Sequence, residues 1–394
     1  MRITQIRQTT VPIRSDMKNA YISFSEMTVS LVAVVSDVIR DGRALVGFGF
    51  NSNGRYSQAG ILSERMIPRL LNANPADLVS DDGNFLDPRK AWREMMRNEK
   101  PGGHGERSVA IGVLDMALWD LASKCTGQPL YRFIRDTFGA ELGISSAKPS
   151  NRIFVYAAGG YYDSGKGITG LMDEMKSYLD RGYTTVKMKI GGATLSEDLK
   201  RIEAVLSLLP SGEYLAVDAN GRFERAQAVE YASALAPYQL KWYEEPGDPL
   251  DFEVNKAVCT QSATPIATGE NIFSHQDVRN LLRYGGMNSS TDFLQMDPAL
   301  SYGLTEYVRM LHVLREQGWS ASRCLPHGGH QFGLQLSAGL GLYGNESYPG
   351  IFKPFGGFAD GIEVENGTVQ NPELPGIGIE QKSELYKLCR ELLP

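Results

Sequence analysis

The second half of this chain repeats one pattern, a short apolar run followed by an amphipathic segment, at intervals of roughly 25 to 32 residues. Short apolar runs indicate buried strands, and amphipathic segments indicate helices. Strands that alternate with helices form βαβ units and a parallel sheet. The expected strands are 154–158, 185–189, 215–218, 242–244, 266–268, 293–295 and 322–325, with an eighth inside 343–355. The expected helices between them include 171–179, 196–208, 226–235 and 303–316.

Eight such units favour an α/β fold closed into a (β/α)₈-type barrel over residues 150–360. An open, doubly wound parallel sheet is the structural alternative. It usually carries a GxGxxG turn at the start of a helix, and no such turn opens any of these helices.

The first 140 residues follow a different pattern and are expected to form a separate α+β domain. Residues 1 to 60 are predicted to be antiparallel strands, with a turn at Asp41-Gly42. The segment 109–124 has helical periodicity, and Gly127 just beyond it is a typical helix stop. The polar stretch 139–152 is expected to be a linker.

The C-terminal tail, residues 361–394, is expected to pack back on this N-terminal domain. It contains a predicted strand at 362–365 and a turn at Asn366-Gly367.

Composition excludes several classes of protein. Of the 394 residues, 40 are Lys or Arg and 46 are Asp or Glu, a net charge of -6, so no basic surface is expected for nucleic acid. The four cysteines form no CxxC pair, which fits a reducing, cytoplasmic location. The longest apolar stretch, around 31–35, is too short to span a membrane.

One ionisable residue stands at or just after the end of each of six consecutive expected strands. Active sites of α/β barrels lie at the carboxyl ends of the strands, so these side chains should meet at one mouth. Their spacings are 29, 26, 26, 27 and 30 residues, about one βα unit each. The six residues are Lys189, Asp218, Glu244, Glu270, Asp297 and His327.

Three of them, Asp218, Glu244 and Glu270, are neighbouring carboxylates. Each one alone is compatible with a helix cap or a surface ion pair. Together they would repel one another unless a cation neutralised them. Oxygen-only ligands suit Mg²⁺, so a magnesium site is expected here. Glu245 is expected to point to the opposite side of the strand and to be structural.

Lys187 and Lys189 lie two residues apart and so share one face of the expected strand. Two ammonium groups beside a divalent cation are expected to lose basicity, and a neutral lysine can act as a general base. The alternative is an edge strand with exposed lysines. His327 follows Asp297 by one unit, and that carboxylate is expected to hold the tautomer of the imidazole.

These motifs resemble those of the enolase superfamily, mandelate racemase-like subgroup. They are the Lys-Met-Lys, Asp-Ala-Asn, Glu-Glu-Pro and Gly-Glu-Asn sequences together with Asp297, His327 and the helix segment 113–121. The resemblance implies a (β/α)₇β barrel with an α+β capping domain built from both chain termini. It also implies one Mg²⁺ per subunit on the three carboxylates.

The resemblance implies removal of the proton α to a carboxylate. Lys189 would take the proton, and Lys187 would add positive charge beside the same carboxylate. His327 would either return a proton to the α-carbon, which gives a racemase, or protonate a β-hydroxyl, which gives a dehydratase. Asp297 stands where some relatives carry a lysine, which argues for hydroxyacid substrates. At the eighth strand, Glu346 is the only nearby candidate for an acidic group.

Within the subgroup, the segments 156–162 and 327–333 resemble those of D-tartrate dehydratases. This implies a small dicarboxylate hydroxyacid substrate and oxaloacetate as product. The second carboxylate needs a cation from the capping domain, with Lys100 the first choice and Arg55 and Lys18 alternatives. The substrate-binding residues expected in full are Lys100, Asn51, Asn53, Asn220 and His330.

Three other hypotheses remain open from the sequence. The protein could dehydrate another acid sugar, racemise a hydroxyacid, or be a catalytically silent binding protein on the same scaffold. Resembling proteins are commonly dimers to octamers, which implies a homo-oligomer.

Overall fold

The computed structural model describes every residue except 14, 16, 145–149 and 164, so the middle of the expected linker lies outside the described residues. The N-terminal part begins with an antiparallel sheet of order β1-β2-β3. The β2–β3 turn falls at Asp41-Gly42, as predicted, and both residues have positive φ. The elements of this part are β1 (Ile3–Pro12), β2 (Thr28–Arg40), β3 (Arg43–Phe50), α1 (Ala59–Ile61), α2 (Ile67–Asn72), α3 (Pro88–Met95), α4 (Arg107–Thr126) and α5 (Leu130–Phe138).

Helix α4 lies directly on β3 because two glycines remove the side chains between them. A side-chain carbon at Gly47 would meet the carbonyl oxygen of Ala117 at 2.0 Å, and one at Gly49 would meet that of Val113 at 2.2 Å. The helix is buried over almost its whole length. It ends at Gly127, whose φ of 70° is the expected left-handed helix stop.

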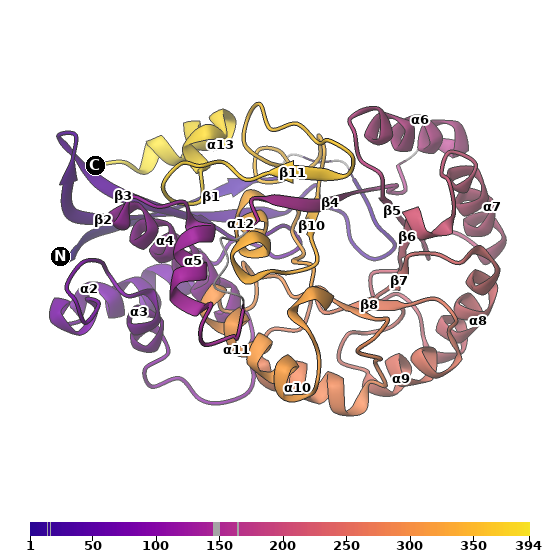
Figure 1. Ribbon diagram of the computed structural model, residues 1–394, viewed down its shortest axis with the longest axis horizontal. Helices are drawn as coiled ribbons and strands as arrows, with labels where there is room; N and C mark the ends of the chain where they lie inside the picture. The colour runs from indigo at the N-terminus through magenta and orange to yellow at the C-terminus, as the bar shows by residue number, and fades with distance from the viewer. Residues whose placement is uncertain (14, 16, 145–149, 164) are drawn as a thin grey trace.

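The rest of the chain forms a parallel barrel of order β10-β4-β5-β6-β7-β8-β9, which confirms the predicted fold class. Its strands are β4 (Arg152–Gly159), β5 (Val186–Lys189), β6 (Leu215–Asp218), β7 (Trp242–Glu244), β8 (Ile266–Thr268), β9 (Phe293–Leu294) and β10 (Asn345–Ser347). Its helices are α6 (Gly167–Asp180), α7 (Leu195–Leu206), α8 (Arg225–Leu235), α9 (Phe252–Gln261), α10 (His275–Tyr284), α11 (Leu304–Glu316) and α12 (Gln331–Leu340). In Figure 1, helices α6–α10 form an arc outside the barrel strands.

The seventh barrel position differs from the prediction. The expected strand 322–325 is a short helical turn, Ala321–Arg323, followed by a single parallel bridge between Leu294 and Cys324. The side chain of Ser320 accepts a hydrogen bond from the turn, which holds these residues out of a strand. The barrel still closes, because the Tyr343 amide donates to the carbonyl of Cys324 at 3.0 Å just before β10.

The C-terminal tail contacts both parts of the molecule. The predicted strand 362–365 is not formed; the strand is β11 (Thr368–Gln370), after the Asn366-Gly367 turn, and it pairs antiparallel with β4. Helix α13 (Ser383–Cys389) lies beside the N-terminal sheet, close to the C-terminus (Figure 1). Among the described helices, none has the length and apolar character needed to cross a bilayer.

A buried carboxyl group ties the two parts together. Asp115 of α4 accepts hydrogen bonds from the hydroxyl of Thr305 at 2.7 Å and from its amide at 3.2 Å, at the first turn of α11. Burial raises the pKa of Asp115 to about 7. The capping part is thereby fixed to a helix that immediately precedes the seventh barrel position.

Candidate active site

Three of the expected charged residues lie side by side at the ends of adjacent strands. In the parallel ladder Lys189 pairs with Asp218, and Asp218 pairs with Glu244. All three side chains are buried. The register therefore sets them side by side at the carboxyl end of the barrel, where an active site is expected.

Asp218, Glu244 and Glu270 form a compact acidic group. One carboxylate oxygen from each lies within 4.8 Å of the others. Burial, with the charge of Asp218 added, raises the pKa of Glu244 to about 8. A bound divalent cation would offset this repulsion, and an all-oxygen donor set suits Mg²⁺. The three residues therefore fit the magnesium site that the sequence predicts.

The two lysines are held by these carboxylates. Lys187 pairs with Glu244, with Glu346 at 2.8 Å and with Asp218 at 3.4 Å. Lys189 pairs with Asp218. Burial alone would lower the pKa of each lysine, but Glu244 raises that of Lys187 and Asp218 raises that of Lys189. Without a cation, each ammonium group is therefore stabilised by its carboxylate partners. The loss of basicity that the sequence predicts applies to lysines beside a bound divalent cation and stays a prediction.

His327 and Asp297 come together as a hydrogen-bonded pair. Nδ1 of His327 lies 2.8 Å from Oδ2 of Asp297, and the other oxygen of Asp297 accepts from the Ala299 amide at 2.7 Å. Nε2 of His327 lies 3.3 Å from Glu270 and 3.2 Å from the hydroxyl of Tyr348. Burial opposes the charged imidazole, but nearby carboxylates, Glu270 first, raise the pKa of His327 to about 10. Asp297 thus leaves Nε2 as the nitrogen that faces the other groups of the site.

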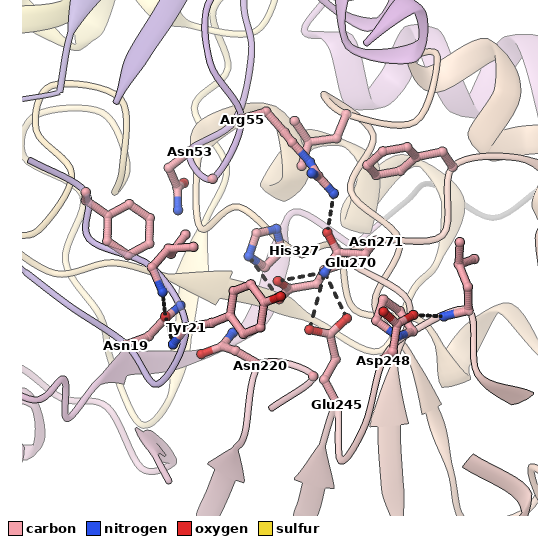
Figure 2. A pocket seen from close by; sticks show the side chains of 18 of the residues that line it. Asn19, Tyr21, Asn53, Arg55, Asn220, Glu245, Asp248, Glu270, Asn271 and His327 are labelled. Carbon is pink, nitrogen blue, oxygen red and sulfur yellow. Dashed lines mark hydrogen bonds and ion pairs between the residues drawn. The ribbon is translucent and has the colours of Figure 1, made fainter. Parts of the chain in front are cut away.

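A cavity of about 590 Å³ lies over these groups. The ends of barrel strands supply Lys189, Glu270 and His327 to its lining, and the N-terminal part supplies Asn53 and Arg55. Figure 2 shows Asn53 and Arg55 reaching in from the opposite side to the barrel residues. The cavity is thus enclosed between the barrel mouth and the capping loops.

The comparison with known families agrees with this geometry. A family model described as "Enolase C-terminal domain-like" matches residues 170–385, more than half of the chain. The chain belongs to the enolase superfamily.

Its relatives include several enzymes that act on acid sugars. An arabinonate dehydratase from Saccharolobus solfataricus is 27% identical over 90% of this chain and 90% of its own length. An L-talarate/galactarate dehydratase from Salmonella typhimurium is 26% identical over 88% and 80%. A 3,6-anhydro-alpha-L-galactonate cycloisomerase from Streptomyces coelicolor is 29% identical over 86% and 87%.

Solved structures share the whole fold. A racemase from Streptomyces coelicolor with bound magnesium superposes with a TM-score of 0.76 at 23% identity, covering 100% of both chains. An L-talarate dehydratase from Polaromonas, complexed with Mg and L-glucarate, gives a TM-score of 0.74 at 24% identity, covering 96% of this chain and 94% of its own.

The enolase-superfamily cavity includes only some of the substrate-binding residues expected from the sequence. Asn53 and Asn220 line it. Lys100 is exposed and does not line it. Asn51 is occupied elsewhere: it accepts from the Ser30 amide at 2.6 Å and donates to two loop carbonyls. The cation that reaches the cavity from the capping side is the alternative, Arg55.

Two further expectations are wrong. His330 does not line the cavity; it is buried, and its Nδ1 accepts from the Gly333 amide as the N-cap of α12. Lys18, the other alternative cation, is exposed and also lies outside the lining. Loop residues such as these obey no periodicity, so spacing could not sort cavity side chains from structural ones.

Glu245 reaches the cavity, contrary to expectation. Strand β7 ends at Glu244, and Glu245 then takes a positive φ of 40°, so strand alternation no longer applies to it. Its carboxylate accepts from the side chain of Asn271 at 3.0 Å, and Asn271 in turn accepts from Arg55 at 2.7 Å. These contacts are visible in Figure 2.

The sequence left the eighth strand open, and the structure places Glu346 there. Glu346 lies at the centre of β10 and is fully buried. It pairs with Lys187 at 2.8 Å and accepts from the Gly328 amide at 3.0 Å. Two tyrosines that the sequence did not single out, Tyr161 and Tyr348, also line the cavity.

Proposed function

We propose that this protein is a magnesium-dependent dehydratase of a hydroxylated dicarboxylic acid, with D-tartrate as its predicted substrate and oxaloacetate as product. The observation that carries the proposal is the order of groups around the barrel mouth. Lys189 and His327 flank the three-carboxylate group from its two sides along the sheet order. A base and an acid on either side of a site that would hold a cation suit removal of an α-proton and loss of a β-hydroxyl.

The metal ion would be held by Asp218, Glu244 and Glu270. When bound, Mg²⁺ supplies positive charge that favours the negative charge developing on the substrate carboxylate.

The chain's own residues carry the proton transfers. Lys189 takes the α-proton, and Lys187 keeps a second positive charge beneath the same site. His327 donates a proton from Nε2 to the β-hydroxyl, which leaves as water. Asp297 accepts from Nδ1 and so fixes the tautomer that presents Nε2.

The second carboxylate of the substrate is assigned to Arg55. It contributes a guanidinium group to the cavity from the capping side, stacked 5.0 Å from the centre of the Phe273 ring. Arginine binds carboxylates through two parallel hydrogen bonds. This favours a dicarboxylate over the monocarboxylate that an arabinonate dehydratase takes. The cavity of about 590 Å³ also has room for aldarates longer than tartrate.

The proposal is tested by measuring 2-keto acid formation in the presence of Mg²⁺. The panel is D-, L- and meso-tartrate, galactarate, L-talarate, glucarate and D-arabinonate. Turnover of D-tartrate alone, abolished by EDTA and by Lys189→Ala, is the expected result. Turnover of a longer aldarate keeps the dehydratase and refutes the tartrate assignment.

A racemase is the second candidate, because the same Lys189 and His327 pair can serve two faces of an α-carbon. Incubation of single enantiomers in D₂O separates the two. Inversion with deuterium uptake and no keto acid supports a racemase. A protein that neither exchanges nor eliminates any of these acids contradicts both activities and leaves the silent binding protein.

A further inference from the structure

Tyr348 is the residue that follows β10, and its side chain lies beside the imidazole ring of His327. Its side chain is buried, with 2% exposed, yet it lines the cavity. The hydroxyl lies 3.2 Å from Nε2 of His327. Asp297 occupies Nδ1 of the same ring, so the hydroxyl stands beside the nitrogen that faces substrate.

The position of the Tyr348 ring is closely constrained. Phe352 packs against it edge-on, with ring centres 5.0 Å apart. On another side, a side-chain carbon at Gly329 would come within 2.5 Å of the ring, so only glycine fits there. Gly329 also accepts a hydrogen bond from the Gly357 amide at 2.8 Å.

Lys382, in the C-terminal tail, binds the segment 355–357, which includes Gly357. Lys382 is buried and donates to the carbonyl oxygens of Phe355 and Gly357, each at 2.9 Å. Gly329 and this distant lysine thus both bind the segment 355–357, which lies next to Tyr348.

The Tyr348 hydroxyl is available as a hydrogen-bond donor. Burial raises the pKa of Tyr348, so the hydroxyl keeps its proton at neutral pH. Because the hydroxyl lies 3.2 Å from Nε2, an oxygen atom placed between the two on the cavity side can lie within hydrogen-bond distance of both. The Tyr348 hydroxyl and Nε2 of His327 can then donate to the same oxygen atom.

We propose that Tyr348 is a further catalytic residue, whose hydroxyl donates a hydrogen bond to the same β-hydroxyl oxygen that His327 protonates. This rests on the proposed dehydratase function. Lys189 takes the α-proton, and the electrons of that C–H bond form the new C=C bond. The β C–O bond breaks, its oxygen takes the proton from Nε2, and water leaves. Tyr348 keeps its proton and stabilises the negative charge that develops on the departing oxygen.

The test is Tyr348→Phe, which keeps the ring and removes only the hydroxyl. The matched control is Tyr183→Phe: that hydroxyl bonds Ser347, the neighbour of Tyr348, at 2.6 Å and lies outside the catalytic cavity. D-Tartrate and galactarate in D₂O serve as probes. Two rates are followed by proton NMR, keto acid formation and total cleavage of the α C–H bond, counted as exchange plus elimination.

The proposal predicts that Tyr348→Phe slows keto acid formation about 10- to 100-fold. Total α C–H cleavage and KM stay within about threefold, because Lys189 and the metal site are untouched. Tyr183→Phe keeps both rates.

Keto acid formation at the unaltered rate in Tyr348→Phe would overturn the proposal. An equal fall in cleavage and elimination would also overturn it, because it would show a purely structural role. If the unaltered protein neither exchanges nor eliminates either probe or any acid of the panel, the proposed function fails and this inference fails with it. If the unaltered enzyme is active and Tyr348→Phe is equally active, only the proposed role of Tyr348 is refuted, and the proposed function stands.

Discussion

Replacing Arg55 with methionine isolates the step that selects a dicarboxylate. The change keeps the length of the side chain and removes its charge. In the structure, Nη2 of Arg55 donates to the side chain of Asn271 at 2.7 Å, and the guanidinium lies 5.0 Å from the centre of the Phe273 ring. The group is half-buried and already oriented toward the cavity.

The size of the effect follows from that position. A hydrogen bond to a charged partner contributes about 1.5–3 kcal/mol, and every 1.4 kcal/mol is tenfold in affinity or rate. Because Arg55 is only half-buried, solvent weakens the interaction, and the lower half of that range applies. Arg55→Met should therefore lower kcat/KM for a dicarboxylate about 10- to 50-fold. A monocarboxylate has no distal charge to lose, so its value should stay within about threefold.

The assay compares kcat/KM for D-tartrate or galactarate with that for D-arabinonate, or with its inhibition constant if it does not react. Lys100→Met is the matched control, because Lys100 is an exposed cation outside the cavity, and it should change neither value. Equal losses for the two kinds of acid, or a loss in Lys100→Met alone, would refute the assignment of Arg55.

Three further predictions concern the metal, the buried Asp115 and His330. Mg²⁺ at about 100 times its dissociation constant should stabilise the protein by about 2.7 kcal/mol, seen as a higher Tm that EDTA reverses; the same shift in Asp218→Asn would contradict the site. The folded-state pKa of Asp115 is about 7, above its unfolded value of 3.8, so stability should fall as pH rises between these values, by at most about 1.4 kcal/mol per pH unit. Urea unfolding should give a flatter pH profile for Asp115→Asn, and parallel profiles would refute this. His330→Ala should lower the free energy of unfolding by about 1 kcal/mol, because α12 loses its N-cap hydrogen bond, and KM should stay unchanged. A tenfold higher KM would instead show that His330 binds the substrate.

The barrel and its ring of charged residues could be predicted because both follow from one period. Parallel strands that each end in an ionisable residue must deliver those residues to one edge, whatever the loops do. Lys189, Asp218 and Glu244 show this directly, since they are register partners on adjacent strands. The pairing of Asp297 with His327 came from the same spacing.

Residues outside the period were predicted less well. Asn51, Asn53 and Arg55 lie within five positions of one another, yet only the last two line the cavity. Glu245 was assigned to the wrong side because strand alternation stops one residue before it. The carboxylates that surround the lysines could not be placed from spacing either, since the pKa of each lysine depends on which charges lie within a few ångströms.

The sequence by itself determined the alternation of strands and helices, the end of the barrel at which six charged residues gather, and the acidic group suited to Mg²⁺. These properties are local or periodic, so chain order carries them. Only the tertiary structure decided that Tyr348 stands beside Nε2 of His327, that Arg55 rather than Lys100 reaches the cavity and that Lys187 is enclosed by carboxylates. Each of those facts depends on contacts between segments far apart in the chain, and such contacts arise only when the loops and the tail pack on the closed barrel.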